Sequence, residues 1–164
     1  MDILKIYEYA LQREREGRDF FLNNAARFQH AAAVDAFKKL AAEEEQHIVF
    51  IERLIAALQG RGAEGLTVGE DMEKEGFFSD RAGAELMDQT VIEAMVPDLP
   101  VLRTAYLIER DFAEFYEMWS GRVEEEMAKK SLQMLARWER QHEALFKSMH
   151  DRAFEEYASM PWGG

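Results

Sequence analysis

Four long stretches of the sequence repeat apolar residues at the three- and four-residue spacing of an amphipathic α-helix. Neighbouring stretches within each half are joined by only a few residues, so they must fold back antiparallel on each other. With 164 residues, 48% hydrophobic residues and only 3 prolines, the chain can bury a core without interrupting these helices. The spacing therefore predicts an all-α fold.

The stretches form two helical hairpins. The first is expected over about 3–59, with its connection near 29–33, and the second over about 98–158, with its turn within 123–128. Helices of this length bury their apolar stripes best against each other, side by side. We predict one antiparallel four-helix bundle that forms a single domain over 1–164.

A crossover of about 60–97 joins the two hairpins. Its first part, Gly60–Ser79, is rich in glycine and acidic residues and is predicted to be loop. A short extra helix is expected over Arg81–Met95, where apolar residues offer a face that can be buried.

Each apolar stripe is interrupted by a glutamate at a core position. In the second and fourth helices a histidine follows that glutamate by three residues and interrupts the neighbouring line of the stripe. The six polar residues at predicted core positions are Glu14, Glu44, His47, Glu109, Glu139 and His142.

Four unpaired carboxylates in an apolar interior would cost several kcal/mol each. The summed cost is comparable with the net stability of a whole domain, about 5–15 kcal/mol. Two divalent cations would balance four carboxylates, with the two imidazoles as neutral ligands. The sequence has no cysteine, which leaves carboxylate and imidazole as the ligand types. We therefore predict a dinuclear metal site inside the bundle.

The two halves of the chain are related by a constant offset. Glu14 and Glu109 are 95 residues apart, and the same offset relates Glu44 to Glu139 and His47 to His142. Further residues match under this offset, which indicates a duplicated helical hairpin. Duplication would place the two sets of ligands symmetrically.

Net charge and the N-terminal sequence exclude several function classes. A net charge of −12 argues against binding to nucleic acid or to an anionic membrane. The first residues lack the basic start and apolar run of a signal peptide, and no run approaches the ~18 apolar residues of a membrane span. We expect a cytoplasmic protein.

The segments around the six residues resemble the rubrerythrin-related branch of the ferritin-like superfamily. ALQREREGRDFF and AYLIERDFAEFY are similar to its first and third helices, and FKKLAAEEEQH and LQMLARWERQH to its second and fourth. The resemblance covers the four long helices and implies a ferritin-like bundle that holds two iron ions. It implies one terminal ligand per metal from Glu14 and Glu109, bridging by Glu44 and Glu139, and one imidazole per metal from His47 and His142.

Two departures from rubrerythrin proper are visible. That protein carries a four-cysteine, rubredoxin-like domain, whereas this sequence has no cysteine, so an external electron donor is expected. Its additional glutamate, three residues after the third-helix ligand, corresponds here to Phe112. The symmetric six-ligand site of bacterioferritin is the closer likeness.

Two residues near the ligands, Tyr116 and Glu43, have more than one interpretation. Tyr116 shares the inner face, where core packing is the default, but it could also hydrogen-bond near the cavity or donate an electron. Glu43 and Glu45 are expected to be solvated, with Glu43 as a reserve ligand because it lies one turn from His47.

The predicted function is that of a non-haem di-iron protein that oxidises Fe(II) and reduces peroxide or dioxygen. Two alternatives remain open: an iron-storage subunit of a ferritin-like shell, and a non-catalytic metal-binding scaffold. Manganese or a mixed pair of metals also suits these ligands. The resemblance further implies a homo-oligomer, with a dimer expected.

Overall fold

In the computed structural model, residues 2–61, 65–75 and 87–161 are described, and all regular structure among them is helical. The elements in chain order are α1 (Ile3–Ala25), α2 (Ala31–Leu58), α3 (Gly65–Glu75), α5 (Gln89–Met95), the 3-10 turn η1 (Val96–Asp98), α6 (Leu99–Ser120) and α7 (Glu126–Ser159).

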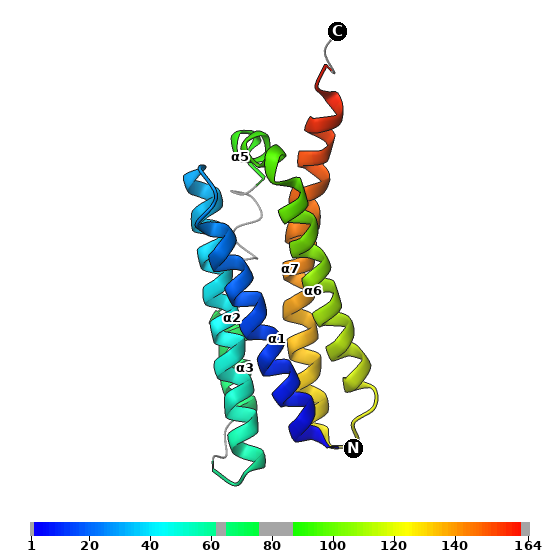
Figure 1. Cartoon of the computed structure of the whole chain (residues 1–164). Helices are drawn as coiled ribbons and strands as arrows, with labels where there is room; N and C mark the ends of the chain where they lie inside the picture. The colour runs from blue at the N-terminus through cyan, green and yellow to red at the C-terminus, as the bar shows by residue number, and fades with distance from the viewer. Residues whose placement is uncertain (1, 62–64, 76–86, 162–164) are drawn as a thin grey trace.

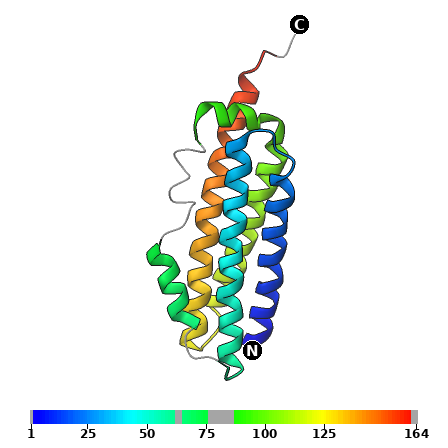
Figure 2. The same cartoon turned by 90° about the vertical axis from the view of Figure 1, so that its left-hand side faces the viewer.

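The four long helices form the predicted antiparallel bundle. Helices α1 and α2 make one hairpin and α6 and α7 the other, and the two hairpins lie side by side (Figures 1 and 2). The crossover returns the chain to the opposite end of the bundle, where α5 and η1 lead into α6 (Figure 1). The expectation of an all-α, ferritin-like bundle of two hairpins is confirmed.

The apolar core is divided into two clusters along the bundle. One cluster contains Phe21, Phe37 and Phe146, whose rings contact one another, and the other contains Phe50 and Trp138. In each long helix the predicted ligands fall between the residues that belong to the two clusters. The polar residues therefore occupy a layer with apolar packing above and below it.

Side-chain caps explain where two of the helices begin. The carboxylate of Asp2 accepts a hydrogen bond from the backbone N–H of Lys5 at the start of α1. The carboxylate of Glu125 accepts from the N–H groups of Met127 and Ala128 at the start of α7. These bonds satisfy donors that a helix start otherwise leaves unpaired.

Two boundaries differ from the sequence-based expectation. The first helix was expected to continue up to the connection near 29–33, but α1 ends at Ala25; the ring of Phe28, beyond this end, packs edge-on against Phe37 with ring centroids 4.6 Å apart. Of the helix expected over Arg81–Met95, residues 81–86 lie outside the described residues. The rest contains α5, which starts at Gln89 after the N-cap Asp88.

The prediction of loop over Gly60–Ser79 was wrong, because α3 lies within this segment. Helix α3 packs against α2 and α7 (Figure 2). A Cβ at Gly69 would come within 2.7 Å of the Phe50 ring and 2.8 Å of the Met134 methyl group, so any larger residue would require these side chains to shift. Burial against α2 and α7 therefore stabilises a helix that its glycine content disfavours.

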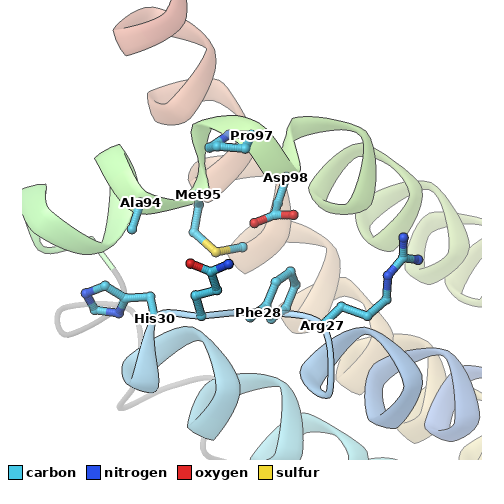
Figure 3. A pocket seen from close by; sticks show the side chains of 8 residues that line it. Arg27, Phe28, His30, Ala94, Met95, Pro97 and Asp98 are labelled. Carbon is cyan, nitrogen blue, oxygen red and sulfur yellow. The ribbon is translucent and has the colours of Figure 1, made fainter.

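A cavity of about 520 Å³ lies at the end of the bundle where α5 and η1 pass the α1–α2 connection. Figure 3 shows its lining, which is formed by residues 27–30 together with Ala94, Met95, Pro97 and Asp98. It is built from other residues than the predicted metal ligands. No helix among the described residues is both long and apolar enough to cross a lipid bilayer.

Candidate metal centre

The structure brings all six predicted ligands together in the centre of the bundle. Their exposed fractions are 0% for five of them and 1% for His142. One glutamate comes from α1 and one from α6, and α2 and α7 each contribute a glutamate and a histidine one turn apart. These side chains form two overlapping groups, and their role as metal ligands remains a prediction.

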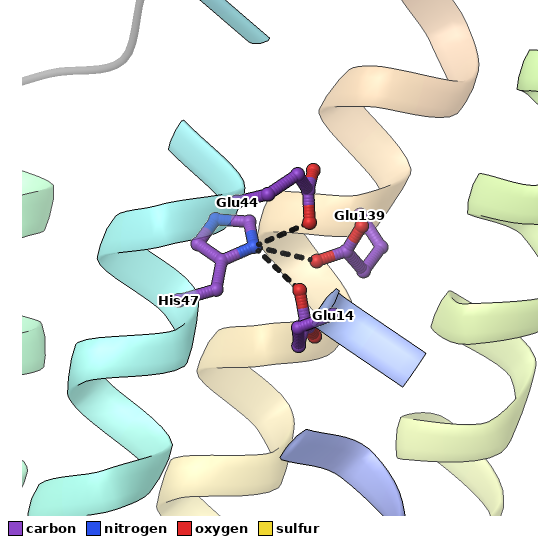
Figure 4. Close-up of side chains that lie close together, drawn as sticks. All are labelled: Glu14, Glu44, His47 and Glu139. Atoms are coloured by element: carbon purple, nitrogen blue, oxygen red, sulfur yellow. Dashed lines mark hydrogen bonds and ion pairs between the residues drawn. The ribbon is translucent and has the colours of Figure 1, made fainter. Parts of the chain in front are cut away.

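The first group surrounds the Nδ1 atom of His47. Figure 4 shows this nitrogen facing three carboxylates: Oε1 of Glu139 at 2.9 Å, Oε2 of Glu14 at 3.1 Å and Oε2 of Glu44 at 3.5 Å. One ligand atom from each of the four residues lies within 4.8 Å of the others. A single cation could be bound by all four.

The second group surrounds the Nδ1 atom of His142. Oε1 of Glu44 lies 3.0 Å from it, Oε2 of Glu109 3.6 Å and Oε2 of Glu139 3.7 Å. These four residues also bring one ligand atom each within 4.8 Å of the others.

Glu44 and Glu139 belong to both groups and use different oxygens in each. Glu44 presents Oε2 to His47 and Oε1 to His142, whereas Glu139 presents Oε1 to His47 and Oε2 to His142. A carboxylate with one oxygen in each of two ligand sets can bridge two cations. The arrangement suits a dinuclear centre with two bridging and two terminal carboxylates.

Buried atoms without hydrogen bonds give a separate test of whether cations fit. Among the described residues, both oxygens of Glu44, Glu109 and Glu139 and the Nδ1 of His142 are buried and accept or donate no hydrogen bond of good geometry. Buried polar atoms are almost always satisfied in folded proteins. Carboxylate oxygens and imidazole nitrogens directed at a common point are the ligands that iron and manganese bind. The residues therefore fit a pair of divalent cations.

Without cations, burial and close contact shift the proton affinities of these groups. Burial raises the pKa of Glu14 to about 8 and raises the pKa of Glu139 well above its usual range. Burial alone would also raise the pKa of Glu44, but the two imidazoles beside it hold that pKa below its ordinary value. The surrounding carboxylates outweigh burial at His47 and His142 and raise both pKa values. Bound protons thus balance the metal-free cluster.

The expectation that Glu43 is solvated was wrong. Only 5% of Glu43 is exposed, and its Oε2 lies 2.7 Å from the Nε2 of His142 on α7. Glu45 is exposed, as expected, and pairs with Arg18. Glu43 approaches the second histidine from across the bundle, so its distance from His47 along α2 did not reveal this contact.

Two aromatic side chains also contact the ligands. The hydroxyl of Tyr116 donates a hydrogen bond to Oε1 of Glu14, and Tyr116 is 1% exposed. This contact agrees with the hydrogen-bonding interpretation of Tyr116; its catalytic role remains a prediction. Trp138 stacks on the imidazole of His47 and was not predicted from the sequence. Its indole N–H donates to Oε1 of Glu73 on α3, at 3.2 Å.

Comparison with known proteins agrees with this geometry. The Rubrerythrin family model matches residues 5–150, a range that contains all six predicted ligands. Searches of curated proteins and of solved structures found no significant match. Since the family match extends over most of the sequence and over both hairpins, the chain belongs to the rubrerythrin family.

Proposed function

We propose that this protein is a non-haem di-iron protein that oxidises Fe(II) and reduces peroxide or dioxygen inside the bundle. The observation that carries the proposal is the pair of overlapping ligand groups that share Glu44 and Glu139. Membership of the rubrerythrin family supports iron as the metal. Each iron would take one terminal glutamate and one histidine, from Glu14 and His47 or from Glu109 and His142.

When bound, two ferrous ions would supply two electrons, which is the number needed to reduce hydrogen peroxide to two waters with two protons. The side chains of this chain provide the surroundings for that reaction. The buried carboxylates would hold the cations apart from bulk water, and the hydroxyl of Tyr116 holds a proton at Oε1 of Glu14. Apolar residues on both sides of the ligand layer keep the reaction space dry.

Continuous turnover requires an electron donor that returns the oxidised metals to the ferrous state. With no cysteine in the sequence, the chain itself offers no iron–sulfur or rubredoxin-type relay. We therefore propose that an external donor supplies the electrons. We also propose that the protein is cytoplasmic and assembles into a homodimer.

The decisive experiment combines metal analysis with oxidant consumption. Protein loaded anaerobically with Fe(II) is expected to retain about two irons per chain, and added peroxide should be consumed with a ligand-to-metal absorption band appearing. The Glu139→Gln variant should lose this reaction, whereas Glu155→Gln, an exposed change on the same helix, should keep it. Protein that binds two irons yet consumes neither peroxide nor dioxygen would contradict the proposal.

Sizing separates the proposed enzyme from an iron store. A ferritin-like store needs a closed shell of many subunits, so sedimentation velocity should give a large assembly in that case and a dimer in ours. A dimer with inert metal would instead favour the scaffold interpretation.

A further inference from the structure

The residues around the centre do not share the symmetry of the ligands. Under the offset of 95 residues the six ligands correspond in pairs, but Glu43 corresponds to Trp138, and Phe21 corresponds to Tyr116. All four side chains are buried. The two ends of the centre are therefore surrounded by different kinds of side chain.

The first difference concerns the two imidazoles. On one side, Glu43 lies 2.7 Å from the Nε2 of His142, so Nε2–H can donate to this carboxylate while Nδ1, which faces Glu44 and Glu109, is left to bind a cation. A carboxylate partner fixes the tautomer of an imidazole and increases its basicity as a ligand. On the other side, Trp138 presents the face of its indole to His47, with ring centroids 5.0 Å apart. An indole has no hydrogen-bond acceptor, so Trp138 cannot do for His47 what Glu43 does for His142.

The second difference concerns the two terminal carboxylates. Oε1 of Glu14 already accepts the hydrogen bond of Tyr116, which leaves mainly Oε2 for a cation. Phe21, at the corresponding position of the other half, has no hydroxyl to offer to Glu109. Both oxygens of Glu109 are buried without a hydrogen bond among the described residues, so both can bind one cation. Both differences favour cation binding at the end of the centre formed by Glu109 and His142.

We propose that the two cation positions are inequivalent: a first divalent cation binds tightly at Glu109 and His142, and a second binds more weakly at Glu14 and His47. The proposal rests on the proposed di-metal function but does not follow from it, because the six ligands alone would give two equal positions. The weaker position, where Tyr116 occupies one carboxylate oxygen, is the one at which a ligand or a cation exchanges more readily.

Cobalt(II) is a suitable probe, because it takes the same ligands as ferrous iron and is stable in air. Crystals of the full chain grown with one equivalent of cobalt(II) should show an anomalous difference peak beside Glu109 and His142 and little beside Glu14 and His47. Equal peaks, or a stronger peak beside His47, would overturn the proposal. This arm needs no substitution.

Titration of the full chain with cobalt(II), followed by calorimetry and by the visible d–d bands, should resolve two steps. Glu43→Leu is expected to weaken the first step by about 10- to 100-fold. Glu43→Gln keeps an acceptor for the His142 N–H and should weaken the first binding step less than Glu43→Leu does. The matched control is Glu45→Gln, an exposed neighbour on α2 that should leave both steps unchanged. Weakening of both steps alike would show that Glu43 has only a structural role.

Tyr116→Phe provides the converse test at the other position. Release of Oε1 of Glu14 makes a second carboxylate oxygen available to the cation, so the second step should tighten while the first step stays the same. Tyr106→Phe, a half-buried tyrosine on the same helix, is the control. An unchanged second step in Tyr116→Phe would contradict the assignment of the weaker position.

Different results of the cobalt experiments would contradict the proposed function and the inequivalence of the two positions. Absence of any cobalt binding would remove the metal centre itself and, with it, the proposed di-iron chemistry. Two cobalt ions bound with indistinguishable affinities would keep the centre and overturn only the inequivalence.

Discussion

The indole ring of Trp138 stacks on the imidazole of His47, with ring centroids 5.0 Å apart and an angle of 24° between the ring planes. This contact places one of the three tryptophans directly against a predicted metal ligand. It connects the centre to α3, because the indole N–H of Trp138 donates to Glu73, which also binds Arg137 at 2.7 Å.

Tryptophan fluorescence should therefore report on metal binding. A paramagnetic cation bound by His47 lies close enough to Trp138 to quench its emission, so cobalt(II) titration of the wild-type protein should lower the fluorescence. Trp138→Phe should lose most of this response, whereas Trp119→Phe, a partly buried tryptophan on α6, should retain it. A full response in Trp138→Phe, with cobalt binding verified by calorimetry, would contradict the proximity of His47 to a bound cation.

Glu139→Gln should stabilise the metal-free protein while it removes metal binding. Burial raises the pKa of Glu139, which means that its charged form is unfavourable in the fold without cations. An isosteric neutral amide avoids that cost, and we expect a gain of about 1–3 kcal/mol in the free energy of unfolding at pH 8. Urea unfolding with a chelator present measures it, and the exposed change Glu155→Gln should stay within about 0.5 kcal/mol of wild type. Loss of stability in Glu139→Gln would mean that its carboxylate is favourably paired without metal.

The stability that cations add should increase with pH. The pKa of Glu14 rises from 4.5 to about 8 in the metal-free fold, so between these pH values the folded state binds more protons than the unfolded state. The raised pKa values of His47 and His142 act in the same direction above pH 6.5. More protons on the folded state mean that metal-free stability falls as pH rises, whereas bound cations replace those protons.

Thermal unfolding at pH 6 and pH 8, with a chelator or with cobalt(II), measures this effect. The difference in Tm between loaded and metal-free protein should be larger at pH 8. Surface charges contribute equally to both forms and cancel in that difference. Parallel changes of the two Tm values with pH would show that the cluster does not exchange protons for cations.

Gly69→Ala should destabilise the protein and displace α3. The added Cβ would lie 2.7 Å from the ring of Phe50 and 2.8 Å from the methyl group of Met134, closer than carbon atoms pack. Overpacking of this kind costs about 1–3 kcal/mol. Gly121→Ala is the matched control, because a Cβ there meets only backbone oxygens at ordinary distances of 3.7 and 3.8 Å. Chemical denaturation compares the two, and equal stabilities would place α3 away from α2 and α7.

The sequence by itself determined the four long helices and their pairing. Apolar residues recur at helical spacing along each stretch, and two short connections leave antiparallel hairpins as the only compact arrangement. It also determined which polar residues face inward, because Glu44 and His47 stand on the same lines as Leu40 and Ile51. A regular period is a local property, so it can be read without knowledge of the neighbouring helices.

Only the tertiary structure decided what surrounds those ligands. Glu43 lies beside the stripe of its own helix, and its contact with His142 depends on how α2 is rotated toward α7. Helix α3 forms where the local sequence favours a loop, because Gly69 lets it approach Phe50 and Met134. Contacts between residues distant in the chain depend on helix rotation and close approach, and neither leaves a periodic signal in the sequence.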